Sequence, residues 1–180
     1  MKYPIGIQTF SQIIEQGFVY VDKTDMVYSL ATEGKVYFLS RPRRFGKSLL
    51  LSTLRAYFEG RKELFRGLKI EALEKDWHPH TVFHLDFNGI DYTMPNALRA
   101  KLEGYFAGWE AEYHIPPSPD FNPASRFEQI IQAAAKQSGR GVVVLVDEYD
   151  KPLLDALEMD ETLQHQNREI LKAFYSVFKQ

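Results

Sequence analysis

The stretch Ser40-Arg41-Pro42-Arg43-Arg44-Phe45-Gly46-Lys47-Ser48 decides the fold. It follows a short apolar run at 36–39 (VYFL), which is rich in β-forming residues and predicts a buried strand. It opens the segment 48–58, whose apolar residues recur at helical spacing. A strand that leads through a basic, glycine-containing loop into a helix is the local structure in which many proteins bind phosphate groups.

The loop has the second half of the pattern G-x-x-x-x-G-K-[ST], with Arg41 at the first glycine position. Gly46 lets the backbone approach a phosphate, Lys47 can neutralise β- and γ-phosphate charge, and the Ser48 hydroxyl can bind Mg²⁺. Pro42 lacks an amide hydrogen, so we expect the amide donors after it. The expected nucleotide-binding residues are Arg43, Arg44, Phe45, Gly46, Lys47, Ser48 and Leu49. By itself the tripeptide at 46–48 would also fit a basic surface turn.

A second motif follows the run at 142–146, where five apolar residues, four of them β-branched, predict a strand. Asp147 comes at the carboxyl end of this strand and could hold Mg²⁺, and Glu148 could activate a water as general base. Parallel strands present their carboxyl ends at one edge of a sheet, so we expect Ser48 and Asp147 to converge. The expected catalytic residues are Glu148 and Lys47, and the expected metal ligands are Ser48 and Asp147. A glutamate directly after the aspartate favours ATP over GTP.

Strand candidates at 36–39, 81–87 and 142–146 alternate with helical patterns along the chain. Thr93 is expected to cap a long helix that reaches Tyr113, and Ser125 with Glu128 forms the pattern of a capping box. The alternation predicts an α/β fold in three layers, α/β/α, with a mainly parallel sheet.

The amino-acid composition and net charge exclude several classes of protein. The chain has 180 residues with 13 Phe, 10 Tyr and 2 Trp, too many aromatic residues for a disordered chain. A net charge of −2 argues against a general polyanion binder, so we expect no direct nucleic-acid binding. The absence of Cys excludes disulfides, thiolate metal sites and a cysteine nucleophile. No apolar run approaches the ~20 residues that span a bilayer, and we expect no membrane association and a cytoplasmic location.

Three strings carry a family resemblance: YVDKT at 20–24, VYFLSRPRRFGKSLLLSTLRAYFEG at 36–60 and VVVLVDEYDKPLLDAL at 142–157. They resemble the AAA-ATPase-like family of bacterial P-loop NTPases, whose members often carry a C-terminal PD-(D/E)XK nuclease-type domain. The resemblance implies a P-loop NTPase that uses ATP and Mg²⁺, with the residues of both motifs in the roles given above. Arg41 at the first glycine position also resembles the pattern of this family. Asp22 and Lys23 belong to a shared motif that could line the nucleotide pocket or cap the next helix.

The resemblance also sets the expected domain plan. Residues 1–180 would form one P-loop domain, with an N-terminal helical segment at 1–34 and a nucleotide-binding core at 35–180. This core would be incomplete at its C-terminal end, since family members continue into a further strand and helices. ATP hydrolysis would then serve as the motor or regulatory part of a longer protein that could form homo-oligomers. The alternatives are a non-hydrolysing nucleotide switch and a regulatory module of a nuclease-linked protein.

Overall fold

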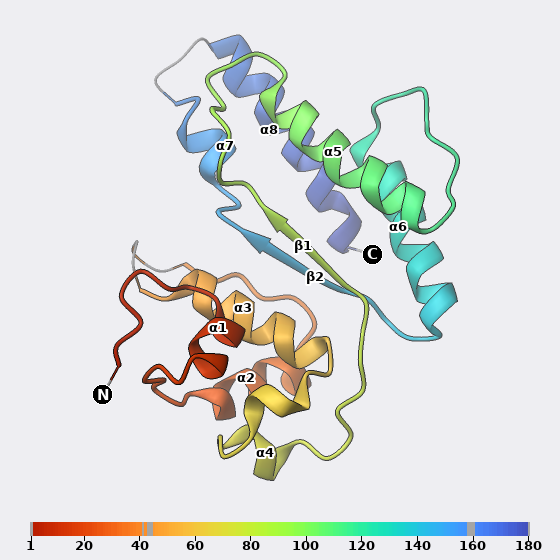
Figure 1. Cartoon of the computed structure of the whole chain (residues 1–180). Coiled ribbons are helices and arrows are strands. Elements are labelled where there is room, and N and C mark those ends of the chain that lie inside the picture. Colours follow the sequence, from red (N-terminus) through yellow and green to blue (C-terminus); the bar gives the residue numbers. More distant parts are fainter. Residues whose placement is uncertain (1, 41, 43–44, 158–160, 180) are drawn as a thin grey trace. The chain divides into compact units, whose positions relative to one another are not determined.

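The computed structural model describes residues 2–40, 42, 45–157 and 161–179. The described elements are mainly helices, with two strands among them (Figure 1). They are α1 (Phe10–Glu15), α2 (Thr24–Glu33), α3 (Lys47–Phe58), the 3₁₀ helix η1 (Lys62–Phe65), α4 (Ile70–Leu73), β1 (Val82–Asp86), α5 (Ala97–Glu112), α6 (Pro123–Ser138), β2 (Val143–Asp147), α7 (Lys151–Leu154), α8 (Glu161–Ser176) and the 3₁₀ helix η2 (Val177–Lys179).

The two strands form a small parallel sheet, in which β1 lies beside β2 (Figure 1). The backbone amide of Val143 donates to the carbonyl of Thr81 at 2.9 Å, and the amide of Phe87 donates to the carbonyl of Asp147 at 3.2 Å. α5 and α6 connect the strands, as parallel pairing requires a long crossover. The α/β class is therefore confirmed, and the strands at 81–87 and 142–146 form close to their predicted positions. The three-layer arrangement stays a prediction.

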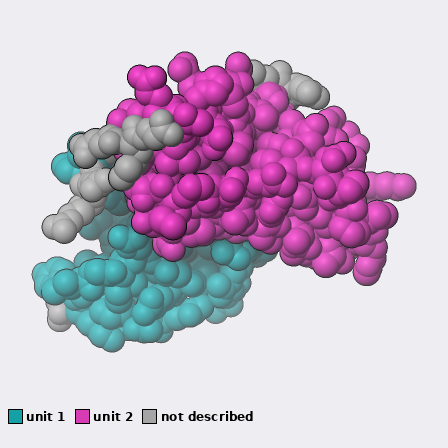
Figure 2. Space-filling model, turned by 90° about the horizontal axis from the view of Figure 1, so that it is seen from above, with its two compact units in different colours: residues 1–84, 143–145 teal, residues 85–142, 146–180 magenta. Residues whose placement is uncertain are grey.

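The chain divides into two compact units, coloured separately in Figure 2. Unit 1 comprises residues 1–84 and 143–145, and unit 2 comprises residues 85–142 and 146–180. Each unit is described by itself. The predicted plan of a single domain with a boundary near residue 34 is not tested by this division.

Unit 1 packs its helices around a core of aromatic and aliphatic side chains. α1 packs on α3, and α2 packs on both α3 and α4. The rings of Phe10 and Phe65 lie 4.8 Å apart, and Trp77 lies 5.1 Å from Phe65. The buried members of this core are Phe10, Val27, Ala56, Leu64, Phe65 and Ile70. Burial of these apolar groups is the main force that holds the unit together.

Unit 2 contains a bundle in which α5, α6 and α8 pack against one another. The ring centroids of Phe106, Phe127 and Phe174, one from each helix, lie 5.2–6.4 Å apart. Beside them, the guanidinium of Arg126 donates two hydrogen bonds of 2.7 Å to the carboxylate of Glu110. Both side chains are almost fully buried, so this pair ties α5 to α6 inside the apolar core.

The predicted strand at 36–39 is wrong. These residues form no strand in the structure, and Val36, Tyr37 and Phe38 are 52–73% exposed. A strand needs a neighbour for its backbone hydrogen bonds, and β2, the strand that ends in the second motif, pairs with β1. The Tyr37 side chain folds back onto Gly34, where an added Cβ would lie 2.6 Å from the tyrosine oxygen. Strand propensity alone therefore does not make this segment a strand.

Two predicted helix caps are also wrong. α5 begins three residues after the expected start, because Thr93 donates both its amide and its hydroxyl hydrogen to the carboxylate of Asp91. The cap of α6 is Asn122, whose side chain accepts a hydrogen bond from the amide of Ser125 at 3.0 Å. Pro123 occupies the first turn of that helix, where a missing amide hydrogen costs nothing.

Candidate functional site

The helix that the phosphate-loop motif predicts is present as α3, although the predicted strand before the loop is not. Gly46 is the N-cap of α3 and has a φ of +76°, in the left-handed region that favours glycine. An added Cβ there would meet no heavy atom within 4 Å, so the backbone angle is what favours glycine at this position. The first bond of the helix is donated by the Leu50 amide to the Gly46 carbonyl at 3.0 Å. The amides of the first turn have no partner within a helix and point toward its N-terminal side, where an anion can bind.

The other predicted residues of this loop differ in exposure. Lys47 and Ser48 are half-buried in the first turn of α3, and Phe45 is 65% exposed. Leu49 packs its side chain against the core of unit 1, so its amide is the group that it can offer to a ligand. Arg41, Arg43 and Arg44 lie outside the described residues.

The carboxyl end of β2 positions the second motif. Asp147 is 6% exposed, and one carboxylate oxygen accepts a hydrogen bond from the amide of Glu148 at 3.0 Å. Glu148 is half-buried and has a φ of +51°. A left-handed conformation costs a residue other than glycine roughly 1–2 kcal/mol, and such strain is concentrated at functional sites. The acidic pair is therefore held in a strained turn.

Groups of α7 and α8, which sequence reasoning did not single out, hold this turn in place. The amide of Lys151 donates to the carbonyl of Glu148 at 3.0 Å. From α8, the side-chain amide of Asn167 donates to the carbonyl of Pro152 at 3.0 Å, and the hydroxyl of Tyr175 donates to the carbonyl of Tyr149 at 3.3 Å. Polar side chains on an otherwise apolar helix face are the signal that could have found Asn167 and Tyr175.

A third acidic residue accompanies the pair, and sequence reasoning missed it. The two backbone bonds between the strands fix a register in which Asp86 of β1 lies opposite Asp147 of β2. Residues opposite each other in a parallel pair place their side chains on the same face of the sheet. Both strands end in an aspartate, and that shared ending was the available signal.

Asp22 accepts hydrogen bonds at the start of α2, which supports the second of the two roles that the motif left open; a place in the nucleotide pocket stays a prediction. One carboxylate oxygen accepts hydrogen bonds from the amide of Thr24 at 2.9 Å and from its hydroxyl at 2.7 Å. The other accepts from the amide of Lys69 at 2.8 Å, 47 residues along the chain. Burial opposes ionisation of Asp22, but these hydrogen bonds outweigh it and hold the pKa below its usual value. Lys23, the neighbouring residue of the motif, is exposed at the start of α2.

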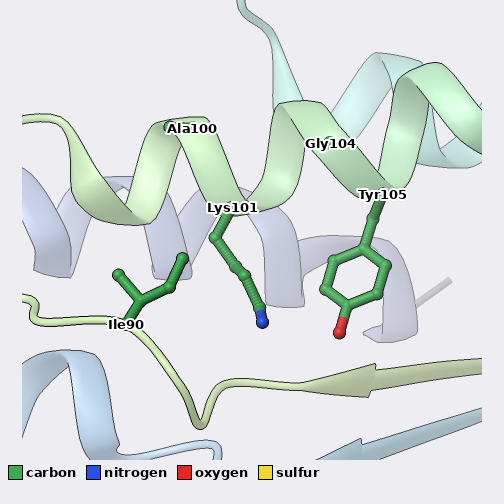
Figure 3. A pocket seen from close by; sticks show the side chains of 5 residues that line it. All are labelled: Ile90, Ala100, Lys101, Gly104 and Tyr105. Carbon is green, nitrogen blue, oxygen red and sulfur yellow. The ribbon is translucent and has the colours of Figure 1, made fainter.

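Two surface hollows lie away from the predicted residues. In unit 2, a groove of about 440 Å³ lies between α5 and the segment after β1, and Figure 3 shows the side chains of Lys101 and Tyr105 directed into it. The Tyr105 hydroxyl donates to the carbonyl of Asp86 at 3.2 Å and accepts from its amide at 3.0 Å, which anchors the end of β1. In unit 1, a polar pocket of about 240 Å³ lies between α1 and α3.

The structure groups the predicted residues by unit. Lys47 and Ser48 belong to unit 1, and Asp147 and Glu148 belong to unit 2. Their convergence on one nucleotide stays a prediction. Within the described ranges, no three His, Asp or Glu side chains form a cluster that could hold a metal ion by themselves. In the same part of the chain, no helix combines the length and apolar character needed to cross a membrane.

Comparison with known proteins supports the family suggested by these motifs. The model of the family described as "Predicted AAA-ATPase" matches residues 4–180. A protein of Azotobacter chroococcum mcd 1, described as "Uncharacterized protein in vnfD 5'region", is 43% identical over 180 residues. The match covers 99% of this chain and 34% of that protein, so the chain spans about a third of its relative's length. No solved structure gives a significant match. The chain belongs to the AAA-ATPase-like family, and membership of this family implies nucleotide use.

Proposed function

We propose that the chain binds Mg·ATP and hydrolyses its β–γ phosphate bond, as the motor or regulatory part of a longer protein. The observation that carries this proposal is the left-handed Gly46 at the start of α3, followed at once by Lys47 and Ser48. That geometry aims the helix dipole and the first-turn amides at a bound anion. Lys47 adds a positive charge, and Arg43 and Arg44 add more.

The donor set suits magnesium. Mg²⁺ prefers oxygen ligands, and the Ser48 hydroxyl and the Asp147 carboxylate supply two. When bound, the ion neutralises charge on the phosphate oxygens. Glu148 is the general base, which takes a proton from the water that attacks the γ-phosphorus as the bond to the β–γ bridging oxygen breaks. An arginine of a neighbouring subunit, or of a further segment such as longer family members have, would complete the site, as in related phosphoryl-transfer enzymes.

Calorimetric titration with Mg·ATP tests binding. We expect heat of binding from the wild-type chain and from Lys75→Ala, which removes an exposed lysine from the same unit. Lys47→Ala should lose most of this heat, because it removes the charge beside the phosphates. Equal heats for the Lys47 and Lys75 variants would refute the phosphate site. The same titration with Mg·GTP measures the expected preference for ATP.

Turnover separates the hydrolase from its alternatives. Glu148→Gln keeps the size of the side chain and removes the base, so it should bind Mg·ATP normally and release no phosphate. Binding without phosphate release by either protein would instead indicate a non-hydrolysing nucleotide switch. DNA binding or cleavage by residues 1–180 would favour the nucleic-acid-processing alternative, and we expect neither.

A further inference from the structure

Two aspartates occupy opposite positions at the carboxyl edge of the sheet. The register of β1 and β2 puts Asp86 opposite Asp147, on strands that run about 4.8 Å apart. Asp147 is buried and Asp86 is half-buried, so water screens their mutual repulsion only in part. Like charges directly opposite each other on paired strands are destabilising. This edge of the sheet therefore favours a cation.

No ion pair between described residues supplies that positive charge. Among the described residues, the ion pairs involve neither Asp86 nor Asp147. The lysine that follows β2, Lys151, is paired with Asp155 at 2.6 Å. Within the described residues, backbone amides donate to the two carboxylates: the amide of Asn88 donates to Asp86 at 2.8 Å, and the amide of Glu148 donates to Asp147 at 3.0 Å. These contacts leave oxygen lone pairs for a ligand.

A buried hydroxyl that interacts electrostatically with Asp86 points to a polar ligand. Tyr92 is fully buried, and its hydroxyl has no hydrogen-bond partner in the described part of the chain. Burial raises the pKa of Tyr92, and the nearby hydroxyl of Tyr105 and the charges of Asp86 and Asp155 raise it further. A buried hydroxyl without a partner is unfavourable, and a water molecule is the usual remedy. The hydration shell of a cation held at Asp86 would provide one.

We propose that Asp86 is a second carboxylate of the magnesium site, holding through hydration water the ion that Asp147 binds. This inference rests on the proposed function, and it adds a residue from β1 to the magnesium ligands that the sequence predicts. Mg²⁺ usually keeps several waters and is bound through one or two carboxylates together with phosphate oxygens. A pair of aspartates at opposite positions of adjacent strands, with the buried Tyr92 hydroxyl in electrostatic interaction with one of them, fits that requirement.

Metal binding tests the inference directly. Mn²⁺ replaces Mg²⁺ as the probe, and the electron paramagnetic resonance signal of free Mn²⁺ is followed with and without ATP. The variants are Asp86→Asn, Asp147→Asn and the control Asp120→Asn, which removes one negative charge from an exposed loop. An asparagine at 86 can still accept the hydrogen bond from Asn88. We expect the Asp86 and Asp147 variants each to lose roughly tenfold or more in Mn²⁺ affinity and the Asp120 variant to match wild type.

Thermal denaturation shows whether Asp86 acts through the metal or through the fold. Without metal, Asp86→Asn should melt at or above the wild-type temperature, because the repulsion from Asp147 is gone. Mg²⁺ should then raise the melting temperature of wild type more than that of the variant. Melting of metal-free Asp86→Asn clearly below wild type would assign Asp86 a structural role and overturn the inference.

The outcomes distinguish this inference from the proposed function. Wild-type Mn²⁺ affinity in Asp86→Asn, with a loss in Asp147→Asn, would refute the role of Asp86 and leave the nucleotide site intact. No Mn²⁺ binding by wild type, with or without ATP, would overturn the inference as well. ATP heats that are equal in wild type and Lys47→Ala would refute the nucleotide site, whatever the metal titrations show.

Discussion

Replacing Asp22 by asparagine should destabilise unit 1 by about 1–2 kcal/mol at pH 7. The carboxylate accepts hydrogen bonds from the Thr24 amide, the Thr24 hydroxyl and the Lys69 amide, at 2.7–2.9 Å. An asparagine keeps one acceptor oxygen, but its NH₂ group must then face one of these donors. Hydrogen bonds to charged groups contribute about 1.5–3 kcal/mol, and partial exposure of Asp22 lets water recover some of the loss.

The effect reaches beyond α2, because Thr24 continues the network. The Thr24 hydroxyl oxygen accepts a hydrogen bond from the buried amide of Ile70 at 3.1 Å, so the pair Asp22–Thr24 holds two successive amides at the start of α4. Asp22→Ala removes all the acceptors of the carboxylate and should cost about 2–4 kcal/mol on the same scale. Asp76→Asn, which alters an exposed carboxylate of unit 1, is the charge-matched control and should unfold like wild type.

Tryptophan fluorescence during urea denaturation can measure the free energy of unfolding of unit 1 separately. The chain has two tryptophans, and Trp77 lies in unit 1 whereas Trp109 lies in unit 2. In a Trp109→Phe background, the fluorescence of Trp77 reports the unfolding of unit 1. The rings of Tyr57 and Phe65 pack beside Trp77, so its emission should change when this core opens.

The stabilising effect of Asp22 should depend on pH in a definite direction. Because the pKa of Asp22 is lowered in the folded state, its stabilising contribution is complete above the unfolded value near 3.9 and is lost as pH falls through the folded value. The difference between wild type and Asp22→Asn should therefore shrink as the pH is lowered from 7 to about 3. Equal stability of Asp22→Asn and Asp76→Asn at pH 7 would refute the reasoning, as would a difference that persists undiminished in acid.

Three further predictions concern single sites. Gly46→Ala should destabilise the start of α3 by about 1–2 kcal/mol, because alanine is strained at a φ of +76°. Calorimetry should also show weaker Mg·ATP binding by this variant. Unchanged binding would contradict the proposed role of this turn. Arg126→Ala should lower the free energy of unfolding, measured by urea denaturation, by about 3–5 kcal/mol, because Glu110 is left buried and unpaired. Replacing both partners by apolar residues should leave the free energy of unfolding close to that of wild type. Equal losses in the two variants would show that the ion pair itself provides the stability. Glu148→Gly should raise the free energy of unfolding by about 1 kcal/mol, because glycine relieves the strain of the left-handed turn, and it should abolish phosphate release. A melting temperature below that of wild type would show that this turn is not strained.

Local sequence signals predicted the elements of the candidate site well where one short-range effect dominates. A glycine followed by apolar residues at helical spacing placed the start of α3 within one residue. A run of β-branched residues ending in Asp147 placed β2 almost as closely. Both depend on backbone propensity and burial within a few residues, which a sequence pattern records directly.

Effects between distant residues were harder to predict. The segment 36–39 has strand propensity, but hydrogen bonding needs a partner strand, which local sequence does not record. Thr93 resembled a helix cap, and the competing carboxylate of Asp91 two residues earlier took its hydrogens. The pairing of Asp86 with Asp147 depends on strand register, which is set by distant packing.

The hydrogen bond from the Lys69 amide to Asp22 closes a loop of the chain whose ends are 47 residues apart. α3 and its first turn lie inside that loop. The segment that we propose binds phosphate therefore lies between two residues, Asp22 and Lys69, that are joined by a hydrogen bond. During synthesis on the ribosome, the start of α2 emerges long before Lys69 does, and the tie can form only when the later segment has left the exit tunnel. The hydrogen bond that encloses the turn proposed to bind phosphate can therefore form only after residues well beyond that turn have been translated.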